Sequence, residues 1–463
     1  MNTTDYEHDA VPHDQRKGWI SIAAVWIAIG IDLSGAFLGV QLANGMDFWT
    51  AIGATMLGSL LLGLLAMACA YVGAATGFSS AVIARAVFGR IGGAVLALAI
   101  SISLVGWFAV QAGFFGLNAQ IAVTQFTGVE VPVQVFTAIG GVLMALTAFW
   151  GYRAISRLSS LAVPLLLGLL VVGIVVAFVV NGTAGLDAPV ETAISFGAAV
   201  SLVMGIFVLG VVLAPDMARW AKTPKQSMAA GFVGFFFGNS IILVVAIVLA
   251  RIVNESELML IFFVLGLGAV AVVVLILAQW TTNTTNLYSA GLAFASISER
   301  LPRRASTIGL GIISIVLGVL GAADYFVPFI LLIGTIIAPY GGVYLASYFT
   351  ARRAARWQHG SDAPLIHVWA VVAWAVGILV ALATTDPAAG PGFGWFSLTT
   401  ISALDGLLAG FVAYLVLLPL HRRGGRDAAV SAEAAEAAEA GDAVESGLPG
   451  DRVADGRADE VLA

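Results

Sequence analysis

Twelve apolar segments, most of them about 20 residues long, alternate with short polar segments along this chain. A helix of that length matches the hydrocarbon core of a bilayer. The pattern therefore predicts an all-α polytopic membrane protein with twelve transmembrane helices. The predicted spans are residues 19–43, 51–74, 93–121, 133–152, 159–180, 193–214, 227–250, 260–297, 305–321, 326–349, 364–385 and 400–420.

The basic residues support this count of spans. When the N-terminus is placed in the cytoplasm, every lysine and arginine except Arg251 falls on the inner side, whereas the outer loops carry acids such as Asp47 and Glu130. Cytoplasmic loops of membrane proteins carry an excess of Lys and Arg. We therefore expect a multi-pass protein of the plasma (inner) membrane, embedded in the lipid bilayer, with both termini in the cytoplasm.

Composition agrees with this class. The chain is 60% hydrophobic and 10% charged, with a mean hydropathy of +0.99, as is typical of membrane proteins. Residues 1–18 are polar and are expected to form a cytoplasmic segment rather than a cleaved signal peptide, because the first apolar run continues into further spans. The single cysteine, Cys69, lies within a span, which leaves no intrachain disulfide.

The C-terminal residues 424–463 differ from the rest of the chain. They are mainly Ala, Glu, Asp and Gly, with no aromatic residue, and such a segment cannot bury a core. We expect a disordered acidic cytoplasmic tail, with a regulatory role as an alternative to a solvated extension. Ten of the 27 acids lie there, so the net charge of −6 does not indicate a nucleic-acid partner.

The segment 279–286 (QWTTNTTN) has one apolar side chain but lies in the middle of a predicted span. An unpaired amide or hydroxyl in hydrocarbon costs roughly 2–7 kcal/mol, so these side chains must face other helices, an ion, a ligand or a water-filled cavity. Polar residues at membrane depth mark functional sites or join neighbouring helices. Because the run holds Gln279, Asn283 and Asn286, we favour a site, with helix packing as the alternative.

Two spans carry residues that interrupt helices. The first contains Gly30 and Asp32, and the sixth contains Gly205 and Gly210 and ends at Pro215. Interrupted helices at matching positions of two inverted halves indicate the binding site of a secondary transporter, because unwound backbone offers carbonyls and N–H groups to ligands. Close helix packing through glycine is the alternative.

The two interrupted spans are five apart and cross the membrane in opposite senses. We therefore expect residues 19–180 and 193–349 to form inverted repeats of five spans each. Residues 364–420 then add two further helices, which completes a transmembrane domain of residues 19–423.

Seven short motifs follow one another along the predicted spans in the order and spacing of one transporter family. They are Val11-Pro12 with Arg16-Lys17-Gly18, Gly73-Ala74-Ala75-Thr76-Gly77 with Ala84-Arg85 and Phe88-Gly89, Val105-Gly106-Trp107-Phe108, Pro215-Asp216-Met217-Ala218-Arg219-Trp220, Phe237-Gly238-Asn239-Ser240, Trp280-Thr281-Thr282-Asn283, and Pro339-Tyr340-Gly341-Gly342-Val343. Through them the chain resembles the nucleobase–cation symporter family, the cytosine, purine and hydantoin permeases, and most of all its cytosine permease-like members. The resemblance implies a five-plus-five inverted-repeat fold with broken first and sixth spans.

The resemblance also implies a function, namely import of a nucleobase or related planar heterocycle (cytosine, purine, uracil or hydantoin type) by cation symport and alternating access. The ring would stack between Trp107 and Phe207. Its edge would be read by the amides of Gln111, one helical turn after Trp107, and Asn283, since amides both donate and accept. The candidate substrate-binding set is completed by Asn286, Gly210 and Asp32.

A coupling ion is implied in the same way, with no other cofactor. Sodium would sit between the backbone carbonyls of Ala28 and Ile31 and the hydroxyls of Thr281 and Thr282, because a hard cation prefers oxygen ligands. The threonines could instead bond carbonyls one turn back, and a proton is the alternative coupling ion.

Asp32 departs from the cytosine permeases, which carry Phe at this position. A charge at mid-membrane costs at least about 2.5–3.5 kcal/mol, so Asp32 requires a cation, a proton or hydrogen-bond donors. It could be a sodium ligand, a proton-coupling site or the partner of an exocyclic amine. Capping of a broken helix is the structural alternative.

The sequence fits three other classes of protein less well. An enzyme would need a nucleophile–base pair or a metal cluster within the spans, but the histidines lie outside the spans or at their ends, at His8, His13, His359, His367 and His421. A channel or receptor would not explain paired interrupted helices. A cation-coupled transporter of the same fold for an amino acid or amine is the main alternative, and Asp32 is what supports it.

Overall fold

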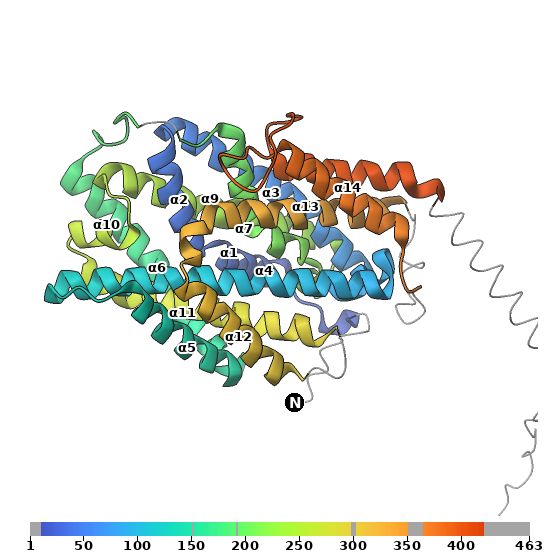
Figure 1. The fold of residues 1–463 in the computed structure, drawn as a ribbon, viewed down its shortest axis with the longest axis horizontal. Coiled ribbons are helices and arrows are strands. Elements are labelled where there is room, and N and C mark those ends of the chain that lie inside the picture. Colours follow the sequence, from blue (N-terminus) through green and yellow to red (C-terminus); the bar gives the residue numbers. More distant parts are fainter. Residues whose placement is uncertain (1–10, 151, 191–192, 298–301, 351–363, 421–463) are drawn as a thin grey trace, which may run out of the picture. The chain divides into compact units, whose positions relative to one another are not determined.

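The computed structural model describes residues 11–150, 152–190, 193–297, 302–350 and 364–420, and most of them are helical (Figure 1). The first ten residues and the predicted tail, residues 424–463, lie outside this part of the chain. Residues up to Val416 form one packed unit, and Leu417 begins a second, of which the last helical residues to Leu420 are described. The helices are α1 (Trp19–Gly30), α2 (Leu33–Gly45), α3 (Phe48–Thr76), α4 (Ser80–Thr127), α5 (Val133–Trp150), α6 (Tyr152–Asn181), α7 (Phe196–Val212), α8 (Pro215–Ala218), α9 (Pro224–Val253), α10 (Leu258–Val264), α11 (Gly268–Ala295), α12 (Arg303–Val319), α13 (Phe326–Thr350), α14 (Val368–Thr384) and a last helix, Ser402–Leu420, with 3₁₀ turns η1 (His13–Gln15) and η2 (Ala322–Tyr325).

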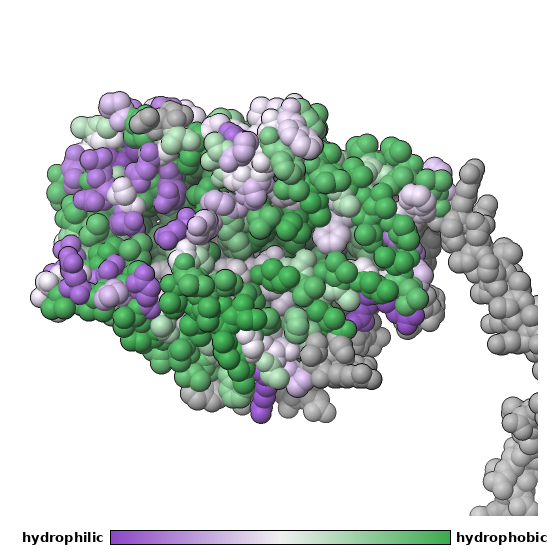
Figure 2. Space-filling view, in the orientation of Figure 1, coloured by the Kyte–Doolittle hydropathy of each residue, from purple (hydrophilic) through white to green (hydrophobic). Residues whose placement is uncertain are grey.

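The helices have the lengths and surfaces of membrane spans. Among the described residues, seven helices are long and apolar enough to cross a bilayer, and four further apolar helices are shorter. Figure 2 shows hydrophobic residues over the middle of the viewed face and hydrophilic residues gathered at its left, around the end of α4. The expectation of an all-helical polytopic membrane protein is confirmed.

Two helix boundaries differ from the predicted ones. The segment predicted as one span, 260–297, is divided into α10 and α11 by Gly266, whose φ of 72° ends the first helix. Helix α4 begins well before the predicted residue 93 and kinks at Gly89, where φ is 83°. Loop residues Pro364 and Leu365 accept the N–H groups that follow this kink, from Arg90 at 3.0 Å and Ile91 at 2.8 Å.

The predicted interruption of the sixth span at its glycines is wrong. Helix α7 is continuous through Gly205 and Gly210 and ends at Val212, shortly before Pro215. A glycine inside a helix costs only about 1 kcal/mol, whereas proline removes a backbone donor. Gly205 serves packing, because a Cβ there would lie 2.7 Å from Cγ2 of Ile330.

The first span has its interruption where it was expected. Helix α1 ends at Gly30, Asp32 is extended with φ −106° and ψ 148°, and α2 begins at Leu33. Gly30 lies against Gly238 of α9, where an added Cβ would come 3.0 Å from the Gly238 Cα. The end of α1 is thus fixed by backbone-to-backbone packing before the chain changes direction.

Two sets of helices pack within the unit. Helices α1, α2 and α3 pack on α9 and α7 packs on α3, whereas α4, α5, α11 and α12 form a second set. Small residues bring α2 onto α9, since Gly39 allows Ala246 and the Leu243 carbonyl to approach its backbone. Such close approach is how membrane helices gain van der Waals contact without a hydrophobic driving force.

The segment before α1 is held by the loop that follows α7. The Lys17 N–H donates to the Trp220 carbonyl at 2.6 Å, and the Lys222 N–H donates to the Lys17 carbonyl at 3.2 Å. In the same loop, the Asp216 carboxylate accepts the Ser80 N–H at the start of α4 at 2.7 Å. Burial raises the pKa of Asp216. Through this loop, these hydrogen bonds connect the residues before the first span to the start of α4.

Arg251, the exception to the inner placement of basic residues, is buried at the end of α9. Its guanidinium donates to the carbonyls of Leu186 (3.0 Å), Ala188 and Ala43 (3.5 Å). Cations are stabilised near helix C-termini, and Ala43 belongs to the last turn of α2. Arg251 therefore joins the ends of α2 and α9 to the segment after α6, which explains a basic residue on the side that the charge pattern assigns to the exterior.

We predict that Gly39→Ala lowers the stability of the protein in detergent by about 1–3 kcal/mol, because overpacking a tight interface costs that much. The added Cβ would lie 2.7 Å from the Ala246 Cβ and 2.8 Å from the Leu243 carbonyl oxygen. Gly168→Ala is the matched control, because no atom lies within 4 Å of its added Cβ. Thermal unfolding measures both variants, and equal melting temperatures would contradict the packing described for α2.

Candidate functional site

The break between α1 and α2 is stabilised by the side chain of Asp32. In a continuous helix the Ser34 N–H would donate to the Gly30 carbonyl, but here it donates to Asp32 Oδ2 at 3.1 Å. Asp32 is therefore the N-cap of α2, a position where a carboxylate is stabilised by the helix dipole. Because the Ser34 N–H bonds Asp32 instead, the Gly30 carbonyl at the end of α1 does not accept this helical hydrogen bond.

Asp32 also connects the broken span to α11. The Thr282 hydroxyl donates to Asp32 Oδ1 at 3.0 Å. One carboxylate thus bonds the start of α2 through one oxygen and the polar stretch of α11 through the other. The Asp32 side chain therefore both caps α2 and connects the two packed sets of helices.

A second polar link joins α2 to α4 beside the first. Gln111 Nε2 donates to Ser34 Oγ at 2.9 Å. The Gln111 side chain is only 3% exposed, and its Oε1 has no hydrogen-bond partner among the described residues. A buried amide oxygen without a partner costs free energy until a donor reaches it, so this atom is suited to accept from a bound molecule.

The two aromatic candidates are both buried. Trp107 lies against α13, with its ring edge-on to Phe329 at 5.3 Å and to Phe326 at 6.3 Å between centroids. Phe207 lies on α7, which packs against α3 and α13. Trp107 and Gln111 share a helix face, as their spacing predicts.

Asn283 joins α11 to α4 and α5. Its Nδ2 lies 3.2 Å from the Phe108 carbonyl and 3.3 Å from Met144 Sδ. Its Oδ1 has no partner among the described residues. The half-buried Asn286 lies one turn further along α11.

The polar stretch 279–286 therefore divides between two roles. Gln279 accepts from Asn118 of α4 at 3.2 Å, and Trp280 donates to Thr147 of α5 at 3.1 Å, so these side chains join helices. Thr282 instead faces the broken span. Helix packing is therefore the role of Gln279 and Trp280, while the interpretation as a site stays a prediction for Thr282 and its neighbours.

The threonines leave oxygen lone pairs available. Thr281 donates its proton to the Ala278 carbonyl at 2.8 Å, as Thr282 does to Asp32. A hydroxyl that donates its one proton keeps two acceptor lone pairs, so both oxygens can still face a cation. Thr282 and Asp32 bring a hydroxyl oxygen and a carboxylate together, and oxygen ligands with a negative charge suit a hard cation.

An aromatic cluster that was not predicted lies beside the site. Phe37 of α2 stacks on Phe114 of α4 at 4.0 Å between centroids, and Phe114 meets Phe326 of α13 edge-on at 5.0 Å. Phe114 follows Trp107 by seven residues, which places it on the same helix face. That spacing was the available signal, and the partner rings on α2 and α13 were not visible in it.

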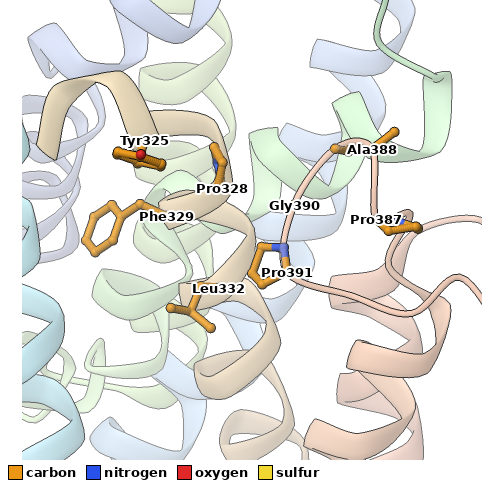
Figure 3. Close-up of a pocket in the computed structure, with 9 residues that line it drawn as sticks. Tyr325, Pro328, Phe329, Leu332, Pro387, Ala388, Gly390 and Pro391 are labelled. Atoms are coloured by element: carbon orange, nitrogen blue, oxygen red, sulfur yellow. The ribbon is translucent and has the colours of Figure 1, made fainter. Parts of the chain in front are cut away.

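A cavity of about 520 Å³ lies on the other side of Phe329 (Figure 3). Tyr325, Pro328, Phe329 and Leu332 line it from η2 and α13, and the loop 387–391 lines it opposite. Phe329 thus lines this cavity and also packs against Trp107. The cavity was not predictable from the sequence, because its walls come from segments far apart in the chain.

Comparison with known proteins identifies close relatives. Residues 10–417 match the sequence profile of the permeases for cytosine/purines, uracil, thiamine and allantoin. The cytosine permease of Escherichia coli (strain K12) is 32% identical over 439 residues, which cover 93% of this chain and 98% of that protein. The hydantoin permease of Microbacterium maritypicum is 23% identical over 373 residues, 73% of this chain and 74% of the permease.

A solved structure shares the fold. It is Mhp1, a nucleobase-cation-symport-1 family transporter, in a closed conformation with bromovinylhydantoin bound. The TM-score is 0.73 at 19% identity, and the match covers 92% of this chain and 96% of Mhp1.

Proposed function

The chain belongs to the family of permeases for cytosine, purines, uracil, thiamine and allantoin, and on this premise we propose that it imports a nucleobase or related planar heterocycle by cation symport. It is a transporter of the membrane and not an enzyme. The observation that carries the proposal is the polar group at the break of the first span, where Thr282, Asp32, Ser34 and Gln111 are joined by hydrogen bonds. Transport would proceed by alternating access at this group.

The proposed architecture has twelve spans in the plasma membrane, with both termini in the cytoplasm. Residues 19–180 and 193–349 would be the inverted repeats, and residues 364–420 the two additional helices. The inner placement of basic residues supports this orientation, and the burial of Arg251 against carbonyls accounts for its one exception.

The substrate ring would lie between Trp107 and Phe207, with Gln111 reading its edge. Both aromatic side chains are buried, and Gln111 carries an amide oxygen free for a donor. Asn283 and Asn286 are proposed as further polar contacts from α11, and Asn283 has its own free amide oxygen. Gly210 is half-buried and belongs to a continuous helix, so its contribution would be the absence of a side chain rather than a free N–H group.

The coupling ion would be sodium or a proton, held next to the substrate. Sodium would take the hydroxyl oxygens of Thr281 and Thr282 with the carbonyls of Ala28 and Ile31, and Asp32 would add a negative charge beside them. A carboxylate at this position also suits a substrate with an amino group. Asp32 is therefore the specific reason to keep a cation-coupled amino acid or amine transporter as the second candidate.

A transport assay in proteoliposomes tests the proposal directly. Purified protein is given radiolabelled bases, hydantoins, amino acids and amines, with an inward sodium gradient or an inward proton gradient. We expect at least one planar heterocycle to accumulate above its equilibrium level, and to do so only with one of the gradients. Accumulation of amines or amino acids alone would favour the second candidate.

We predict that Trp107→Leu and Phe207→Leu weaken substrate binding about 5- to 100-fold, because stacking on an aromatic ring is worth about 1–3 kcal/mol per base. Trp107→Phe keeps a ring and should retain most of the affinity. Trp280→Leu is the matched control, since Trp280 packs against α5. Binding is measured calorimetrically on protein with a normal melting temperature, and wild-type affinity in both leucine variants would exclude the stacked ring.

We predict that Asp32→Asn abolishes ion-driven accumulation but leaves exchange of substrate across the membrane. Asparagine keeps the shape of the side chain and can still accept the Ser34 N–H with its one amide oxygen, while its NH₂ group can donate to the Thr282 hydroxyl. It removes the charge that a cation or proton would neutralise. Asp405→Asn is the control, because Asp405 is a buried carboxylate on the last helix that accepts from Thr399. If Asp32→Asn still concentrates substrate with unchanged sodium and pH dependence, Asp32 is only a helix cap.

A further inference from the structure

Ser34 lies between the carboxylate of Asp32 and the amide of Gln111, and we propose that it is a positioning residue that sets substrate specificity. By holding the Gln111 amide with its NH₂ group toward α2, Ser34 leaves the amide carbonyl as the reading atom. The transporter would then select planar heterocycles that present an N–H donor to Gln111. This inference rests on the proposed function and adds the polarity of the substrate edge.

The polarity follows from the direction of the hydrogen bond between Gln111 and Ser34. Gln111 Nε2 donates to Ser34 Oγ at 2.9 Å, and the Ser34 N–H donates to Asp32 Oδ2 at 3.1 Å. A carboxylate only accepts hydrogen bonds, and a hydroxyl has one proton to donate. In the proposed arrangement the Ser34 hydroxyl directs its proton toward Asp32, so that its oxygen accepts from the NH₂ group of Gln111.

The other end of the amide is then fixed as well. Gln111 Oε1 is buried and has no partner among the described residues. A site built around an unpaired acceptor favours a ligand that supplies a donor and rejects one that presents a second acceptor, because the rejected ligand leaves buried groups unpaired. An amide free to rotate would make no such choice, since it carries both a donor and an acceptor end.

The same hydrogen bonds also connect Gln111, the proposed specificity residue on α4, to Thr282 on α11. Thr282 on α11 and the Ser34 N–H on α2 donate to Asp32, and Gln111 on α4 donates to the Ser34 hydroxyl oxygen. The three donors thus belong to one chain of hydrogen bonds that ends at the Asp32 carboxylate. Ser34 need not touch the substrate, because its effect is transmitted through the orientation of Gln111.

The test compares ligands of the same shape but opposite edge. Uracil and cytosine form one pair, and hypoxanthine and adenine form another, because in each pair a ring N–H beside a carbonyl is replaced by a bare ring nitrogen beside an amino group. Dissociation constants are measured for wild type and for the variants Ser34→Ala and Ser34→Thr. Ser101→Ala is the matched control, since Ser101 is a buried serine of α4 that donates to the Ala290 carbonyl away from this group.

We expect wild type to prefer one member of a bound pair about 10- to 100-fold, as the loss of a hydrogen bond in a buried site implies. Methylation of one ring N–H of the preferred base should abolish its binding. Ser34→Ala should reduce the preference to less than about 3-fold, while Ser34→Thr, which keeps the hydroxyl, and Ser101→Ala should preserve it.

An unchanged preference in Ser34→Ala would overturn the inference, as would equal loss of preference in Ser34→Thr or tolerance of methylation at every ring nitrogen. In those cases bases still bind wild type, so the proposed function would survive. If no base or planar analogue binds wild type, the proposed function fails and this inference fails with it.

Discussion

The carboxylate of Asp32 is the contact on which the candidate site depends. It replaces a helical hydrogen bond by accepting the Ser34 N–H at the break of the first span, and it accepts from Thr282 of α11. Ser34 in turn accepts from Gln111 of α4. A half-buried carboxylate in an apolar span is tolerated because backbone and hydroxyl donors solvate it and the start of α2 stabilises its charge. Three helices that are far apart in sequence thereby meet at one side chain.

The contacts within each set of helices differ from the contacts between the two sets. Within each set of helices, glycines such as Gly39 allow close backbone approach, and amides such as Gln279 make hydrogen bonds between helices. The two sets are connected by the Asp32–Thr282 bond, the Ser34–Gln111 bond and the stacked pair Phe37–Phe114. Such contacts can break and form again when one set of helices moves relative to the other, as the proposed alternating access requires.

Much of the fold and part of the candidate site were predictable from the sequence, and the features that were not predictable depend on contacts between distant segments. Apolar runs of bilayer length predicted the helices, and a carboxylate in an apolar span singled out Asp32. The kink at Gly89 was not predictable, because it depends on the loop after residue 363 that accepts its N–H groups. The direction of Asn283 depends on how α11 is rotated against α5, and the role of Ser34 depends on a neighbour 77 residues away. The break in the first span was predictable from glycine and aspartate together, whereas glycine alone misled in α7.

The most direct test of this account is a cryo-EM structure of the protein with a transported base and its coupling ion bound. The account predicts the ring between Trp107 and Phe207, with the Gln111 carbonyl within hydrogen-bonding distance of a ring N–H and Asp32 beside the ion or its hydroxyl ligands. A base bound instead in the cavity lined by Phe329 and residues 387–391, with Asp32 and Gln111 distant from it, would contradict the account.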